Sequence, residues 1–151
     1  MDSLAELNRF MPNDDITIKW LKMPDDFDLF CEHLSERGPL AKDFTVDVVL
    51  DWERQGITYC GLLKKGKMVA RSAVERYLPD KWETADVRVW ASERGNGYAR
   101  QICCFVTKFI LENNKTATCR TEDYNIPMQH VINALGFKKV GFVSNINENQ
   151  V

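Results

Sequence analysis

The sequence has little net charge, no long apolar run and no basic leader. Its 151 residues carry a formal charge of −2, which gives no reason to expect a nucleic-acid partner. No apolar stretch approaches the ~18 residues of a membrane-spanning helix. The beginning, MDSLAE, lacks the basic and apolar regions of a signal peptide. We therefore expect a cytoplasmic protein without a membrane or nucleic-acid partner.

Cysteine and histidine are present, but not in the spacings of a metal or disulfide site. The five cysteines are an odd number and contain no Cys-x-x-Cys pair, so neither a zinc site nor a disulfide framework is indicated. His33 and His130 have no neighbouring ligand pattern. We expect no metal, and we expect Cys60, Cys103 and Cys119 to pack as small hydrophobic side chains.

Length and hydrophobic patterning predict one α/β domain over residues 1–151. Hydrophobic residues make up 44% and charged residues 28% of the chain, as is ordinary for a globular protein. A short amphipathic helix is expected over residues 4–12. From residue 16 onward, hydrophobic period and capping residues predict the order β-α-α-β-β-β-α-β-α-β. The strands are expected at 16–21, 57–63, 68–74, 85–91, 116–121 and 137–144, and the helices at 26–37, 45–55, 99–112 and 125–135.

A glycine-rich turn separates the fourth predicted strand from the third of these helices. It reads Arg94-Gly95-Asn96-Gly97-Tyr98-Ala99. Glycines let consecutive backbone N–H groups point into one concavity, and a helix start adds unpaired donors and a positive dipole end. The chain has no Gly-Lys-Ser/Thr triplet of a P-loop, and position 100 is Arg where a dinucleotide fingerprint requires Gly. The turn therefore predicts a different phosphate cradle.

This turn, together with a second motif, resembles the GNAT superfamily of acyl-CoA-dependent N-acetyltransferases. Arg94, Gly97 and Ala99 match the family's Arg/Gln-x-x-Gly-x-Gly/Ala diphosphate signature. Asn125 opens a helix that ends in Leu135-Gly136-Phe137, similar to the family's Asn-initiated segment before Gly-Phe. The resemblance covers residues 14–144. It implies the α/β (α+β) GNAT fold, with a mixed central sheet and helices on both faces.

The resemblance implies acetyl-CoA as co-substrate and an amine, small molecule or peptide, as acceptor. In the family, the strand before the turn diverges from its parallel neighbour and exposes backbone groups. Counted back from Arg94, the residue whose N–H would donate to the thioester oxygen is Val89. The alternatives are core packing for the valines, solvation for the arginines and a simple N-cap role for Asn125. The implied CoA-binding residues are Val87, Arg88, Val89, Arg94, Gly95, Asn96, Gly97, Tyr98, Ala99, Arg100 and Asn125.

Asp86 is the first candidate for the general base. An alkyl ammonium with a pKa near 10 is about one part in a thousand neutral at pH 7, so a carboxylate or a water chain must help to deprotonate it. Asp86 lies on the strand that leads to the acetyl site. Its alternatives are a salt bridge with Arg71 or Arg88, or a solvated strand face, and a bulge would change the face it occupies. Other carboxylates near the predicted cleft are Glu83, Glu122 and Asp123.

The general acid departs from the family pattern. Ile132 stands where many members carry the tyrosine that protonates the leaving thiolate. Tyr124 or Tyr98 could replace it, and a thiol with a pKa near 8.5 can also leave unassisted. The missing tyrosine keeps a non-catalytic acyl-CoA-binding module open as an alternative, and a nucleotide-phosphate binder is a third. Only fourteen residues follow Phe137, so an open sheet edge there makes a homodimer possible.

Overall fold

The computed structural model describes residues 15–141 and contains a five-stranded sheet with the strand order β1-β2-β3-β4-β5. Neighbouring strands from β1 to β4 are antiparallel, whereas β4 and β5 are parallel. The mixed sheet implied by the family resemblance is therefore confirmed. The strands are β1 (Ile16–Trp20), β2 (Ile57–Lys64), β3 (Lys67–Glu75), β4 (Lys81–Val89) and β5 (Thr116–Cys119).

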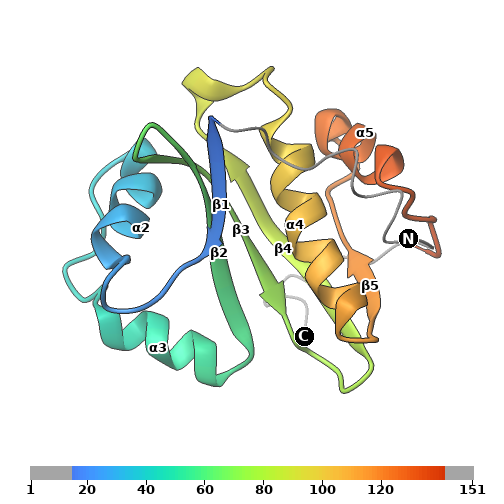
Figure 1. Ribbon diagram of the computed structural model, residues 1–151, viewed down its shortest axis with the longest axis horizontal. Coiled ribbons are helices and arrows are strands. Elements are labelled where there is room, and N and C mark those ends of the chain that lie inside the picture. The colour runs from blue at the N-terminus through green and yellow to red at the C-terminus, as the bar shows by residue number, and fades with distance from the viewer. Residues whose placement is uncertain (1–14, 142–151) are drawn as a thin grey trace, which may run out of the picture.

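Helices cover both faces of this sheet, as predicted. In Figure 1, α2 and α3 lie on one side of the strands, and α4 and α5 lie on the other. Within residues 15–141, no helix combines the length and apolar character needed to cross a membrane. The helices are α2 (Phe27–Leu34), η2 (Ser35–Arg37), α3 (Val46–Arg54), η3 (Ala91–Glu93), α4 (Tyr98–Glu112) and α5 (Ile126–Ala134).

The order of elements from β1 to α5 is the predicted one, but the ends of the prediction differ. Residues 137–141 contain no strand, so the start of the strand predicted over 137–144 is wrong. The rest of that segment and the helix predicted over 4–12 lie outside the described residues.

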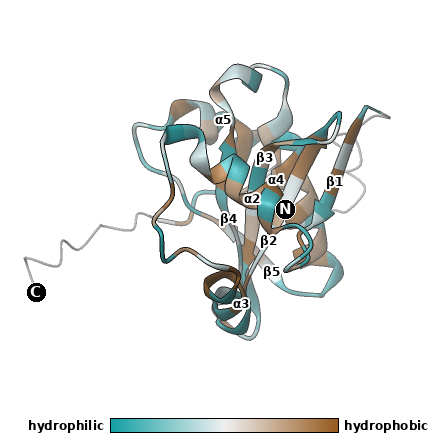
Figure 2. Ribbon diagram, turned by 90° about the vertical axis from the view of Figure 1, so that its left-hand side faces the viewer, coloured by the Kyte–Doolittle hydropathy of each residue, from teal (hydrophilic) through white to brown (hydrophobic). Residues whose placement is uncertain are grey.

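Three buried apolar clusters hold the layers together, two on the α4 face of the sheet and one on the α2 face. On one face, Ile102, Val106 and Ile110 recur along α4 and are fully buried against the sheet. On the other, Phe30 of α2 and Val49 of α3 pack with a separate buried group. Figure 2 shows the hydrophobic colour running along the central strands. Burying side chains of this size stabilises the fold by about 1.5–3 kcal/mol each, so α4 is firmly fixed on the sheet.

The parallel pair β4 and β5 separates partway along its length. Pairing runs from Lys81↔Thr116 to Thr84↔Cys119. β5 ends there, while β4 continues to Val89. The second half of β4 therefore has no β5 partner on that edge, which is the splay implied by the family resemblance.

A β-bulge interrupts β4 within this unpaired half. Arg71 pairs with Arg88 and Ala73 with Ala85, so β4 takes three steps where β3 takes two. Asp86 has a φ of 44°, a left-handed conformation that Asp tolerates better than most residues. The strand predicted over residues 85–91 covers 81–89 instead, and the bulge considered for Asp86 is present.

Candidate functional site

The glycine turn between β4 and α4 forms an open, donor-lined corner. Gly95 and Gly97 have φ values of 86° and 78°, and Gly97 directly precedes α4. Asn96 stabilises the turn through a 2.9 Å hydrogen bond from its Nδ2 to the Glu93 carbonyl. A Cβ built on either glycine would meet no atom within 4 Å. The turn is therefore open at these two positions, beside the first unpaired N–H groups of α4, which are donors suited to an anion.

The charged groups beside this corner suit a diphosphate. Arg94 and Arg100 are both exposed, and neither forms an ion pair with any residue between 15 and 141. Lys64 is paired with Glu93 at 3.1 Å and lies over the Tyr98 ring. Tyr98 itself is only 8% exposed and belongs to the α4 core. Any contact from Tyr98 to a ligand would therefore come from its backbone N–H.

The Val89 N–H points away from β3. Trp90 donates its backbone N–H to the Val69 carbonyl at 2.9 Å, and successive N–H groups of a strand face opposite edges. The N–H of Val89 must then face the edge where β5 has separated. The residue that the family pattern marks as donor to the thioester oxygen is placed to reach that gap.

The neighbouring residues of β4 divide between the two faces of the sheet. Val87 packs against both apolar groups of the α4 face. Arg88 extends to the α2 face, where its Nη2 lies 3.2 Å from Glu36 Oε2. The same carboxylate accepts the backbone N–H of Ala91 at 2.6 Å. Glu36 thus ties the end of β4 to η2, and the Arg88 guanidinium is directed away from α4.

Asp86 is held in a polar network on the α2 face. Its carboxylate accepts hydrogen bonds from the Tyr59 hydroxyl at 2.7 Å and from Arg71 Nε at 3.0 Å and Nη2 at 3.3 Å. Burial raises the pKa of Asp86, but the hydrogen bonds and charge of Arg71 outweigh it and leave that pKa below its ordinary value. The salt bridge with Arg71, one of the alternatives from the sequence, is therefore present, and it weakens Asp86 as a base.

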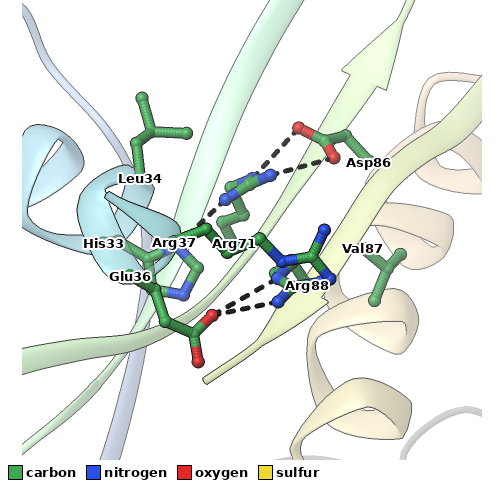
Figure 3. Close-up of a pocket in the computed structure, with 8 residues that line it drawn as sticks. All are labelled: His33, Leu34, Glu36, Arg37, Arg71, Asp86, Val87 and Arg88. Carbon is green, nitrogen blue, oxygen red and sulfur yellow. Dashed lines mark hydrogen bonds and ion pairs between the residues drawn. The ribbon is translucent and has the colours of Figure 1, made fainter. Parts of the chain in front are cut away.

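A pocket of about 330 Å³ opens between η2 and the bulge. Figure 3 shows Arg71 and Arg88 reaching across it from the strands towards the end of α2. The pocket lies on the face of β4 opposite α4 and opens on the bulge from that side. Its lining is mainly charged and consists of His33, Leu34, Glu36, Arg37, Arg71, Asp86, Val87 and Arg88.

The other candidate acid–base groups are separate from this pocket. Glu83 is 5% exposed, and its carboxylate forms two hydrogen bonds with Arg120, at 2.7 and 3.1 Å. Glu122 and Asp123 are exposed in the segment after β5. Tyr124 is 83% exposed, and its hydroxyl has no hydrogen-bond partner within residues 15–141.

Asn125 caps α5. Its Oδ1 accepts the Met128 N–H at 3.2 Å, so the N-cap role anticipated as an alternative is present. This hydrogen bond uses one lone pair of the amide oxygen and leaves the Nδ2 group available. A CoA contact by Asn125 therefore stays a prediction.

Among the described residues, the cysteines and carboxylates form no second candidate catalytic or metal site. Cys60 and Cys103 are buried, as predicted, and Cys119 is half-buried. Burial raises the pKa of every one of these thiols, so none is a ready nucleophile. Across the described part of the chain, no three His, Cys, Asp or Glu side chains are placed to share a metal ion.

Most residues of the pocket were not predicted from the sequence. His33, Glu36 and Arg37 come from the end of a helix that carries no local motif, and only tertiary contact brings them to β4. Arg71, by contrast, could have been recognised from its sequence context. It is the one charged residue inside the apolar run Met68-Val69-Ala70-Arg71-Ser72-Ala73-Val74, and such a residue in a central strand needs a buried partner.

His33 makes stability depend on pH. It is 1% exposed, its Nδ1 lies 3.3 Å from Arg71 Nη1, and its ring stacks on Trp90. Burial, followed by the Arg71 charge, lowers the pKa of His33 to about 4. The unfolded chain, with a histidine pKa near 6.5, then binds more protons between about pH 6.5 and 4, so stability is lost as pH falls through that range.

We expect the free energy of unfolding to drop by about 1–3 kcal/mol between pH 7 and pH 4.5 from this residue. Urea unfolding of the protein and of His33→Gln across that range measures the effect, because Gln keeps an acceptor for Arg71 without a titrating group. The His130→Gln variant, at an exposed position, is the control and should keep the slope. Equal slopes in all three proteins would contradict the assignment to His33.

Comparison with known proteins matches this architecture to solved acetyltransferase structures. No family model matches the sequence, and no curated protein matches it. An acetyltransferase from Trypanosoma brucei superposes with a TM-score of 0.71 at 16% identity, covering 88% of this chain and 99% of its own. The chain has the GNAT fold. Two further structures support the same assignment.

The first of these is AAC(6')-Iy, solved in complex with the bisubstrate analog CoA-S-monomethyl-acetylneamine. It matches with a TM-score of 0.68 at 16% identity, over 88% of this chain and 97% of its own. The second is glucosamine-6-phosphate N-acetyltransferase from Arabidopsis thaliana, with a TM-score of 0.67 at 16% identity, over 88% of this chain and 98% of its own. At this identity the likeness concerns the GNAT fold, and the chemistry of this chain has to be argued from its own site.

Proposed function

We propose that this protein transfers the acetyl group of acetyl-CoA to the nitrogen of an amine. One observation carries the proposal: β4 leaves β5 after Thr84 and turns the Val89 N–H into the gap, directly before the glycine turn that opens α4. A donor for a thioester oxygen and a cradle for a diphosphate thus lie on consecutive parts of the chain. The CoA complex of a structure with the same fold supports this proposal.

CoA binding is assigned to the glycine turn. The backbone N–H groups of residues 95–100 would hold the diphosphate, because the turn geometry and the start of α4 leave these donors free of helix partners. Arg94 and Arg100 would add charge from either side of Gly97. The Asn125 amide, which keeps free donors beside its capping bond, would add a further contact.

In the transfer step the nitrogen attacks the acetyl carbonyl carbon, forming the C–N bond as the C–S bond breaks. The Val89 N–H would stabilise the oxyanion that forms on the carbonyl, a contribution of about 3 kcal/mol in comparable sites. The nitrogen loses one proton and the leaving sulfur can gain one, so the products are the N-acetylated amine and the free thiol of CoA. A thiol with a pKa near 8.5 can leave as thiolate, and this chain therefore needs no tyrosine at position 132.

Asp86 is proposed to take the proton from the nitrogen, directly or through water. It lies at the bulge, three residues before Val89, and on the pocket face of the strand. Its salt bridge with Arg71 keeps it ionised and so able to accept a proton, and because Arg71 and Tyr59 already engage its oxygens, a water chain is favoured over a direct transfer. Tyr124 would act as the general acid only if a bound ligand covered its exposed ring.

The second candidate function is an acyl-CoA-binding module without catalysis. It is favoured by Ile132 at the tyrosine position and by the tight pairing of Asp86 with Arg71 and Tyr59. Such a module would use the glycine turn and the splay to bind the thioester, but would offer no proton acceptor to an amine.

The deciding experiment incubates the purified chain with acetyl-CoA and a panel of primary amines, and detects acetylated product by mass spectrometry. Product detection avoids the background that the five cysteines of the chain would give with thiol reagents. Binding of acetyl-CoA is measured in parallel by calorimetry. Acetylated product supports the transferase, binding without product supports the module, and the absence of binding contradicts both.

A further inference from the structure

The pocket on the α2 face gives information about the acceptor. It opens on the bulge from the side opposite α4, and its wall includes Asp86 and Arg88 of β4. An amine that reached β4 from this side would meet the strand one to three residues before the Val89 N–H. The acceptor inferred from this pocket rests on the proposed transferase function.

The charges that line this pocket do not cancel. Three arginines face two carboxylates, which leaves one excess positive charge. His33 adds none near neutral pH, because burial lowers its pKa to about 4. A purely cationic polyamine would therefore enter against the local field, whereas a molecule with an anionic group would be attracted.

Both carboxylates of the pocket are already engaged. Asp86 accepts from Tyr59 and Arg71, and Glu36 accepts from Arg88 and from the Ala91 N–H. The free acceptors that would recognise a second ammonium group are therefore few. Because these carboxylates are paired, the groups of the pocket that are still free to bind a ligand are mainly hydrogen-bond donors.

Arg37 supplies the unpaired charge. It is exposed at the end of η2, it lines the pocket, and no carboxylate between residues 15 and 141 forms an ion pair with it. Arg88 contacts Glu36 through Nε and Nη2, which leaves its Nη1 donors available on the same wall. Guanidinium groups present paired N–H donors that match the oxygens of a carboxylate or a phosphate.

We propose that the acceptor is an amine that also carries an oxyanion, with Arg37 and Arg88 holding the oxyanion while the amine faces the bulge at Asp86. The volume of about 330 Å³ suits a small molecule or the end of a chain. The anionic group anchors the acceptor at η2, and the nitrogen is thereby turned towards β4.

The test compares acceptors with and without an anionic group. 4-Aminobutyrate is paired with the nearly isosteric 4-aminobutanamide, and phosphoethanolamine with ethanolamine, while 1,4-diaminobutane carries a second ammonium group instead. We expect kcat/KM for the member with the anionic group of at least one pair to exceed that of its partner, whose end group is neutral, by about 10-fold or more, as a charge-assisted hydrogen bond provides. The preferred pair distinguishes a carboxylate from a phosphate.

Variants of the pocket complete the test. Arg37→Gln should lower the anionic-to-neutral ratio of kcat/KM by about 10-fold, mainly through KM, and Arg37→Glu should shift preference towards 1,4-diaminobutane. Arg54→Gln removes the same charge from α3, outside the pocket, and should leave the ratio unchanged. Transfer to amines without an anionic preference, or an unchanged ratio in Arg37→Gln, overturns this inference and leaves the transferase standing. If acetyl-CoA binds but no amine of the panel is acetylated, the transferase and this inference fall together.

Discussion

Replacing Gly97 with glutamate is expected to abolish acetyl-CoA binding, with the dissociation constant rising by at least about 100-fold. Gly97 has a φ of 78° and lies at the N-terminus of α4, where a side chain would extend into the open corner. A carboxylate there would meet a diphosphate bound at the proposed cradle, and the desolvated like-charge contact would cost several kcal/mol. Calorimetry with acetyl-CoA measures the change.

A matched control separates charge at the cradle from general damage. Asn114 also has a left-handed backbone, with a φ of 60°, and lies just beyond the opposite end of α4. Asn114→Glu therefore adds the same charge on a similar conformation, at the far end of a 15-residue helix that is about 22 Å long at 1.5 Å per residue. Its affinity for acetyl-CoA should equal that of the unmodified protein.

A conformational control is Gly97→Ala, which adds only a methyl group in open space. It should cost about 1 kcal/mol of stability through the left-handed φ and change affinity by a few-fold. If folded Gly97→Glu binds acetyl-CoA as tightly as Asn114→Glu does, the diphosphate lies elsewhere and the cradle assignment is wrong.

Asp86→Asn is expected to lower kcat by about 100-fold while acetyl-CoA binding changes little. The asparagine can retain the left-handed φ of 44° at the bulge and the hydrogen bond from Tyr59. What it removes is the negative charge and the proton-accepting oxygen. Steady-state kinetics with the preferred amine, over pH 6–9, gives both kcat and the pH–rate profile.

Tyr59→Phe tests whether Asp86 acts through its own carboxylate or only through the network. The phenyl ring keeps the packing of Tyr59 against Phe30 and Trp52 and deletes only the hydrogen bond to Asp86. A proton-accepting Asp86 predicts a loss of no more than a few-fold in Tyr59→Phe. Equal losses in both variants, with an unchanged pH–rate profile, would make Asp86 a positioning residue and leave water as the acceptor.

Local sequence was sufficient for much of the scaffold. The hydrophobic period of α4 placed Ile102, Val106 and Ile110 on one buried face. The glycines at positions 95 and 97 indicated a turn that can adopt positive φ angles. Asn125 was anticipated as a helix N-cap. Each of these features depends on backbone preferences and on neighbours within a few positions, which a sequence displays directly.

The acceptor side of the site was decided by tertiary structure. No local rule reveals that β4 gains one residue against β3 at Asp86, because the extra residue is defined only by the register of two paired strands. That bulge sends Asp86 to Arg71, and Arg88 reaches Glu36, 52 positions away along the chain. The sequence thus predicted the glycine turn and the start of α4, on which the proposed diphosphate site rests. The folding of α2 and η2 onto β3 and β4 determined the pocket, because its charges become neighbours only when segments distant in sequence pack together.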